Sequence, residues 1–206
     1  MLQNIVFDFG GVLLNLDESR TIKGLQAVLD PALSVDLMEQ VIHPYERGEI
    51  SEEAFFNRLQ RRSVKVLNGD AYFYIWNAML LDMPEQRLNM LRDLRKQYKL
   101  YLLSNTNITH VRNVFRYLHN THGVMDFGSY FDEVFLSHDI HLRKPDSAIY
   151  QYVIHRAGID PATSLFIDDK SENTEAAAAC GFKVWTHDPE QEIAEVISHI
   201  LQRNNV

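Results

Sequence analysis

The chain has 206 residues, of which 46% are apolar and 23% charged, as expected for a folded protein with one main hydrophobic core. Its formal net charge is −8 with no basic block, and no apolar run is long enough to span a bilayer, so neither nucleic acid nor a membrane is an expected partner. The single cysteine, Cys180, and a first stretch unlike a signal peptide favour a cytoplasmic protein.

Short apolar runs alternate with helical patterns along the chain. Because these runs lack polar alternation, each predicts a strand buried on both faces of a parallel sheet. A helix is predicted over 85–97, and another from an N-cap at Asp188, with Pro189 at its first position, to Leu201. The alternation predicts a doubly wound α/β fold. The expected strands are 4–7, 100–103, 133–136, 165–167 and 183–185.

The stretch between the first two expected strands breaks this alternation. Residues 15–82 show helical patterns, one of them with Ser51 as an N-cap, and no convincing strand. Such a stretch is too long for one crossover helix. We therefore predict an inserted small α-helical cap over 15–82 and a core made of 1–14 and 83–206.

Polar residues follow four of the expected strands. Because ligands bind at the carboxyl ends of the strands in an open α/β sheet, these residues are expected to meet in one crevice. A strand-end aspartate or serine alone often only caps a helix, but four such clusters in order are a stronger signal. In chain order the candidates are Asp8 and Gly10, Ser104 and Asn105, Lys144, and finally Asp168 and Asp169.

The electrostatics of that crevice indicate its chemistry. Three inward-facing carboxylates would repel one another by several kcal/mol unless they are neutralised, and a hard cation with oxygen ligands, such as Mg²⁺, is the usual remedy. Lys144 and the hydroxyl of Ser104 could hold an anion beside the metal. The pattern therefore predicts phosphoryl transfer with an aspartate nucleophile.

The segments 8–11, 104–106, 143–145 and 168–170 resemble, as an ordered set, the four motifs of the haloacid dehalogenase-like hydrolase superfamily. The resemblance implies a Rossmann-like core, and the insertion after the first motif resembles the small helical cap of one subclass. With 48–51, the segment 7–13 is also similar to small-cap sugar-phosphate phosphatases, including those acting on glucose 1-phosphate, and to the phosphatase domain of soluble epoxide hydrolases.

The resemblance implies a role for each carboxylate. Asp8 would be the nucleophile, forming an aspartyl-phosphate, and also a metal ligand together with the backbone carbonyl of Gly10. Asp169 would bind the metal directly, and Asp168 would act through water or by orientation. Asn173 lies where many relatives carry a further acid, so its role stays open.

The remaining matches concern the phosphoryl group. Ser104 and the backbone amide of Asn105 would hold it, and Lys144 would neutralise both the nucleophile and the phosphate. The implied cofactor is Mg²⁺ and the implied partner is a small phosphorylated metabolite. The sequence leaves the oligomeric state open and is compatible with a monomer.

One position departs from the family pattern. Most phosphatases of this superfamily carry a second aspartate two residues after the nucleophile, as general acid and base, and this chain has Gly10 there. Losing such a group typically costs a factor of about 10²–10⁴ in rate. Either the protein is a weakly active or non-catalytic regulatory relative, or its substrate has a good leaving group, as a sugar 1-phosphate does. A metal-independent 2-haloacid dehalogenase is a further alternative.

Several side chains stay undecided at this level. Tyr45 and Arg47 could face the site. The cluster of Tyr72, Phe73, Tyr74 and Trp76 could line a sugar pocket under the cap, but such a cluster more often fills a helix core, which is the favoured interpretation. The pairs His119/His122 and His138/His141 have zinc-like spacing but lack a third ligand, so a solvated pair is the simpler interpretation.

Overall fold

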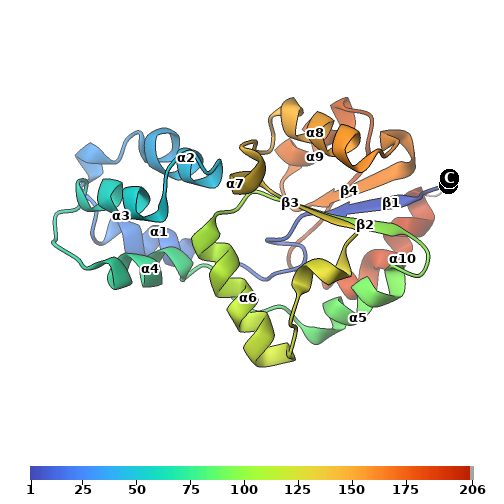
Figure 1. Cartoon of the computed structure of the whole chain (residues 1–206), viewed down its shortest axis with the longest axis horizontal. Helices are drawn as coiled ribbons and strands as arrows, with labels where there is room; N and C mark the ends of the chain where they lie inside the picture. Colours follow the sequence, from blue (N-terminus) through green and yellow to red (C-terminus); the bar gives the residue numbers. More distant parts are fainter. Residues whose placement is uncertain (205–206) are drawn as a thin grey trace.

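The centre of the molecule is a parallel sheet of five strands in the order β3-β2-β1-β4-β5 (Figure 1). The computed structural model describes residues 1–204. Val6 of β1 lies in register with Tyr101 of β2 and with Phe166 of β4. The strand order reverses beside β1, which makes the carboxyl ends of β1 and β4 a switch point where ligands bind. The strands are β1 (Asn4–Phe7), β2 (Lys99–Ser104), β3 (Glu133–Leu136), β4 (Ser164–Asp168) and β5 (Lys183–Thr186).

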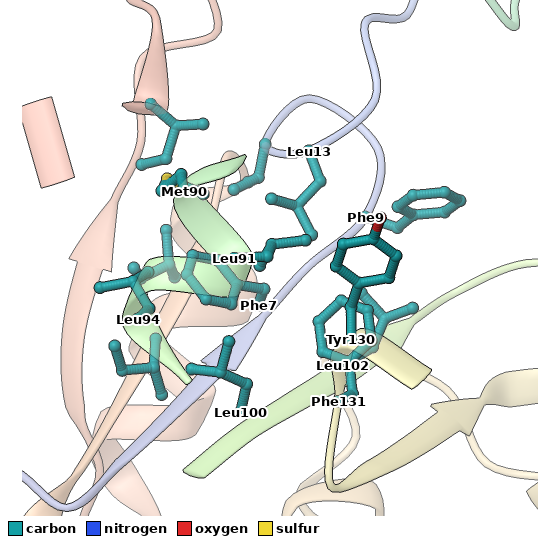
Figure 2. Close-up of a cluster of buried hydrophobic side chains, with 14 of the residues drawn as sticks. Phe7, Phe9, Leu13, Met90, Leu91, Leu94, Leu100, Leu102, Tyr130 and Phe131 are labelled. Atoms are coloured by element: carbon teal, nitrogen blue, oxygen red, sulfur yellow. The ribbon is translucent and has the colours of Figure 1, made fainter. Parts of the chain in front are cut away.

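Helices cover both faces of the sheet, α5 and α10 on one side and α8 and α9 on the other (Figure 1). Successive strand residues point to opposite faces, so Phe7 packs beneath α5 whereas Val6 packs beneath α8. Figure 2 shows the first cluster, in which Phe7 and Leu100 lie near Leu91 of α5. The core helices are α5 (Glu85–Leu94), α6 (Ile108–His122), η3 (Phe127–Tyr130), α7 (Ser137–Ile140), α8 (Ser147–Ala157), η4 (Pro161–Thr163), α9 (Ser171–Ala179) and α10 (Ile193–Asn204).

A helical lobe lies beside the sheet and is inserted between β1 and β2 (Figure 1). Its helices begin where short polar side chains accept a backbone N–H: Asp17 from Ser19, and Ser51, as predicted, from Ala54. The lobe has its own hydrophobic cluster, in which Tyr45 stacks on Phe55. Its elements are α1 (Glu18–Gln26), η1 (Pro31–Leu33), η2 (Met38–Ile42), α2 (His43–Glu46), α3 (Glu52–Gln60) and α4 (Gly69–Asn77).

The two connections between this cap and the core run side by side. Asn15 donates its backbone N–H to Asp82, Leu81 donates to Asn15, and Leu16 pairs with Leu80 in an antiparallel bridge. This pairing supports domain boundaries at 15 and 82, which remain a prediction.

The expected elements differ from the observed ones mainly at their ends. The five strands are found, and the helix expected over 85–97 ends at Leu94. The prediction that Asp188 caps the last helix is wrong. Asp188 closes a turn by accepting the N–H of Glu190, and α10 begins only at Ile193, after Glu192 accepts the N–H of Ala194. A proline after an aspartate favours a turn as much as a helix start, and here the turn prevails.

None of the helices within residues 1–204 has the length and apolar character that crossing a lipid bilayer requires.

Candidate active site

The carboxyl ends of β1, β2 and β4 bring the predicted polar residues together. Asp8 directly follows β1, Ser104 is the last residue of β2, and Asp168 is the last residue of β4. One oxygen each of Asp8, Asp168 and Asp169 can be chosen so that all three lie within 4.8 Å of one another. The crevice predicted from the sequence is therefore present.

Lys144 lies at the centre of this cluster and is only 1% exposed. Its Nζ is 2.8 Å from Oδ1 of Asp8 and 2.6 Å from Oδ2 of Asp168, and it donates to the carbonyl of Leu103 at 2.9 Å. All three ammonium protons thus have acceptors. A buried cation shared by two carboxylates fixes both in place.

Burial and neighbouring charges compete in setting the protonation of these groups. Burial raises the pKa of Asp8 to about 7, against the opposing charge of Lys144 and with a further rise from Asp168. Burial, followed by the charge of Asp168, also raises the pKa of Asp169. Burial alone would lower the pKa of Lys144, but the charges of Asp8 and Asp168 outweigh it and raise that pKa. One more positive charge at the carboxylates would relieve this repulsion.

Asp168 has no free oxygen. Besides its bond to Lys144, its Oδ1 accepts the backbone N–H of Lys170 and the Nδ2 of Asn173, both at 2.9 Å. The side chain is completely buried. Asp168 therefore orients Lys144 and the following loop, and Asn173, whose role the sequence left open, holds Asp168.

Asp169 is arranged in the opposite way. Its Oδ1 is buried and has no hydrogen-bond partner among the described residues. A buried carboxylate oxygen without a donor is costly unless a cation satisfies it. With Asp8 beside it, this donor set of hard oxygens suits Mg²⁺, and Asp8 and Asp169 are the residues that would hold the ion.

Gly11 allows the loop after β1 to approach this oxygen cluster. Its φ of +74° lies in the left-handed region, and a Cβ there would lie 2.6 Å from both Cγ and Oδ2 of Asp169. We expect Gly11→Ala to weaken Mg²⁺ binding by at least about tenfold, since the Asp169 carboxylate would have to move. Calorimetric Mg²⁺ titration measures this.

The control is Gly69→Ala at the start of α4, where a Cβ would meet nothing within 4 Å. Equal Mg²⁺ affinity of the two variants would contradict the expectation for Gly11→Ala.

Ser104 and Asn105 form the corner opposite the carboxylates. The Asn105 side chain accepts the N–H of Lys144 and donates to its carbonyl, both at 2.8 Å, so it fastens the loop that carries Lys144. Ser104 is 3% exposed and its hydroxyl has no partner among residues 1–204. That hydroxyl and the Asn105 backbone amide are available to an anion.

Leu16 packs against Gly10, where the sequence lacks the expected acid. A Cβ at Gly10 would lie 2.5 Å from Cδ1 of Leu16, so an aliphatic side chain occupies the space next to that position. An acid at position 10 would require Leu16 to move.

A cavity of about 270 Å³ extends from the carboxylates toward the cap. Much of its wall is aliphatic, with Leu14, Leu16, Met79 and Leu80 near the two connections. Charged side chains face it as well, from the cap at Glu18 and Glu46 and from the core at Arg143 and Lys170. Cap and core together thus enclose the space beside Asp8.

His110 and Trp76 join the cap to α6 at the wall of this cavity. The His110 ring stacks on Trp76 and its Nε2 lies 3.0 Å from the Trp76 carbonyl, while the Trp76 indole N–H donates to Asn107. Burial lowers the pKa of His110 to about 4. The imidazole is therefore neutral and donates from Nε2.

This pKa predicts acid sensitivity. The unfolded protein binds a proton at His110 below its ordinary pKa of 6.5, whereas the folded protein does so only below about 4. The free energy of unfolding should therefore fall as the pH drops from 6.5 to 4, by about 3 kcal/mol from this residue. In urea titrations, His110→Gln, which keeps a donor for Trp76, should lose that part of the pH dependence. Parallel curves for the two proteins across this window would refute the expectation.

The structure also answers what the sequence left undecided. Of the four aromatic residues, Trp76 belongs to the cap core and also lines the cavity, whereas Tyr72 is buried in the cap core and Tyr74 is 72% exposed. Tyr45 is buried in the cap cluster with its hydroxyl bonded to Thr109, and Arg47 pairs with Glu49. Among the described residues, the histidine pairs belong to no cluster of possible metal ligands. Glu46 was missed, and Arg143 was placed at the site only as part of the segment 143–145 with no role of its own, because nothing in their local sequence indicates that the two side chains meet.

A family model described as haloacid dehalogenase-like hydrolase matches residues 2–181. A D-ribitol-5-phosphate phosphatase from Bacteroides thetaiotaomicron is 28% identical over 189 residues, which is 90% of this chain and 91% of that protein. A sesquiterpene phosphatase from Aspergillus oryzae is 27% identical over 85% of both chains. The crystal structure of a B. thetaiotaomicron enzyme of the same family, complexed with magnesium and inorganic phosphate, superposes with a TM-score of 0.81 at 27% identity, covering 95% of this chain and 99% of that one.

Proposed function

This chain belongs to the haloacid dehalogenase-like hydrolases and is a phosphatase of that family that uses Mg²⁺, and we propose that its substrate is a small sugar or polyol phosphate, preferentially a sugar 1-phosphate. The observation that carries the activity is the cluster of Asp8, Lys144 and the partnerless oxygen of Asp169 at the carboxyl ends of the strands. The preference for a 1-phosphate rests on Gly10.

The proposed reaction begins at Asp8. Its carboxylate oxygen attacks phosphorus, the bond from phosphorus to the substrate's alcohol oxygen breaks, and that oxygen leaves with the bonding electron pair and takes a proton from solvent water. A water molecule then attacks phosphorus and gives a proton to solvent, and the bond from phosphorus to the Asp8 oxygen breaks, which releases inorganic phosphate and restores the Asp8 carboxylate. Lys144, at 2.8 Å, favours the ionised form of Asp8 and holds it in position, and the hydroxyl of Ser104 and the amide of Asn105 would hold the phosphoryl oxygens.

Bound Mg²⁺ would supply positive charge that offsets the repulsion between the Asp8 carboxylate and a phosphate dianion. The chain itself supplies the oxygen ligands of the ion. Asp8 and Asp169 would hold the ion, with the carbonyl of Gly10 as a proposed further ligand. Asp168 keeps its bonds to Lys144, Lys170 and Asn173 and supports the site from behind.

The leaving oxygen receives no help from residue 10. Without a side chain there, and with Leu16 beside it, no acid at that position can protonate the departing alcohol. An anomeric oxygen is a weaker base than the oxygen of an ordinary alcohol and leaves more readily. This argument supports a sugar 1-phosphate, whereas the relative named for D-ribitol 5-phosphate indicates that an ordinary polyol ester is the main competitor.

A comparison of leaving groups tests the proposal. Phosphate release is measured, with and without Mg²⁺, from glucose 1-phosphate, glucose 6-phosphate, D-ribitol 5-phosphate and phenyl phosphate. We expect Mg²⁺-dependent turnover with 1-phosphate preferred over 6-phosphate. A preference for 6-phosphate would refute the leaving-group argument. A folded protein that binds Mg²⁺ but turns over none of these esters would favour the regulatory alternative, and metal-free halide release from a 2-haloacid would favour the dehalogenase.

A further inference from the structure

One ion pair lies inside the cavity beside the catalytic residues and has no part in the chemistry described above. Oε2 of Glu46, from α2 of the cap, is 3.2 Å from Nη2 and 3.3 Å from Nε of Arg143 in the core. The side chains are 19% and 20% exposed, and both line the cavity that contains Asp8. Arg143 directly precedes Lys144 in the chain, so the pair lies next to Ser104 and Asn105, the residues proposed to bind the phosphoryl group.

The pair leaves hydrogen-bonding capacity unused at the wall of the cavity. Both contacts of Arg143 go to one carboxylate oxygen, and the other oxygen of Glu46, Oε1, has no hydrogen-bond partner among the described residues. Burial raises the pKa of Glu46, against the lowering effect of Arg143, so the carboxylate is poorly hydrated. A hydroxyl group entering the cavity could donate to Glu46 and accept from Arg143.

Attachment of the cap does not explain the pair. The same cap segment is already held to the core by Ser137, whose hydroxyl donates to the Glu46 carbonyl at 2.6 Å, and by His141, whose Nδ1 lies 2.7 Å from the Arg47 carbonyl. At Gly48 the backbones approach so closely that a Cβ would lie 2.1 Å from the His138 carbonyl oxygen. A largely buried ion pair adds little net stability over apolar side chains of similar size. Its presence is therefore better explained by a ligand.

Most other polar side chains of the cavity wall already have partners. The single hydroxyl proton of Thr21 is shared between the carbonyls of Ile75 and Trp76, and His110 bonds the same Trp76 carbonyl. Lys170 and Glu18 pair at 3.1 Å, but both are 49% exposed and lie at the rim. Thr106 lines the cavity as well and is 7% exposed, so outside the carboxylate and phosphate groups the remaining enclosed polar side chains are those of Thr106, Glu46 and Arg143, of which only the last two are charged.

We infer that Glu46 and Arg143 form a specificity pair that binds hydroxyl groups of the leaving alcohol and selects a neutral, hydroxylated organic part carrying a single phosphate. The pair has no net charge, so a second phosphate or a carboxylate on the substrate would meet the repulsion of Glu46 as well as the attraction of Arg143. The inference rests on the proposed function and extends it from the leaving oxygen to the rest of the substrate.

Glu46→Gln tests the pair, because it keeps the shape and removes one negative charge. For the better of glucose 1-phosphate and D-ribitol 5-phosphate, we expect KM to rise by about 10-fold or more, as for loss of a hydrogen bond to a charged group. For phosphoglycolate, whose carboxylate can then use Arg143, kcat/KM should rise. Phenyl phosphate, which has no hydroxyl groups, should change less than about twofold. The matched control is Glu49→Gln, the same charge change in an exposed pair with Arg47 at 2.6 Å, outside the cavity.

The outcomes separate the two proposals. If the wild-type protein releases phosphate but Glu46→Gln alters all substrates equally, or none, the specificity pair is refuted while the phosphatase stands. If the wild-type protein is silent, the proposed function fails, and calorimetry still tests the pair. Glucose 1-phosphate should then bind at least about tenfold more weakly to the double variant Asp8→Asn/Glu46→Gln than to Asp8→Asn, and equal binding would refute the pair.

Discussion

Asp8→Asn is expected to lower phosphate release by about 10⁴-fold or more, the largest effect of any single substitution in this chain. An amide has no charged oxygen with which to attack phosphorus, so the aspartyl-phosphate cannot form. The same substitution should increase the free energy of unfolding. Because the fold raises the pKa of Asp8 to about 7, the ionised carboxylate is held at a cost above that pH. In the metal-free protein at pH 8, the free energy of unfolding should rise by up to about 4 kcal/mol.

Phosphate release and urea unfolding of the same preparation measure both effects. The control is Asp93→Asn, an exposed acid of α5 whose Oδ1 lies 2.7 Å from Nζ of Lys96. It should change neither quantity appreciably. Retained turnover in Asp8→Asn would remove Asp8 from the chemistry, and loss of both activity and stability would indicate a mainly structural role.

Lys144→Met should have the second largest effect, and it should damage both activity and stability. The substitution leaves the carboxylates of Asp8 and Asp168 buried without the ammonium that now lies 2.8 and 2.6 Å from them. Removing one partner of a buried ion pair typically costs about 3–5 kcal/mol. Activity should be lost as well, since nothing then offsets the repulsion between Asp8 and phosphate.

Added Mg²⁺ should restore part of the lost stability, because the ion binds the folded carboxylates and replaces some of the missing positive charge. Melting temperatures of Lys144→Met with and without Mg²⁺ measure this, with exposed Lys96→Met as the control. If Mg²⁺ stabilises wild type and Lys144→Met equally, the ion and the ammonium do not serve the same carboxylates. Opposite stability changes in Asp8→Asn and Lys144→Met would establish that this cluster is strained by excess negative charge.

The amino-acid sequence by itself determined the sheet, its helical insertion and the chemical set of the site. Apolar strands without polar alternation predict burial on both faces, which holds for β1 and β4 but not for the edge strands β3 and β5, whose residues are mostly half-buried. Polar residues that follow consecutive strands of a parallel sheet are expected to meet at one edge. The sequence could therefore place Asp8, Ser104, Lys144 and Asp169 at one candidate site, while their individual roles were implied by the resemblance to the family. Local signals were weaker where two structures compete for the same residues, and Asp188 accordingly closes a turn although its sequence also suits a helix cap.

Only the tertiary structure showed which contacts distinguish these groups. Asp168 and Asp169 are neighbours in the sequence, yet one has both oxygens occupied by Lys144, Lys170 and Asn173 while the other keeps a buried oxygen without a partner. Glu46 and Arg143 are 97 residues apart, and their meeting depends on how the cap packs on the core. Sequence patterns report local burial and strand order. Contacts between distant segments, such as that of Glu46 with Arg143, depend on how the separate hydrophobic clusters of the cap and of the core pack. No local sequence pattern contains that information.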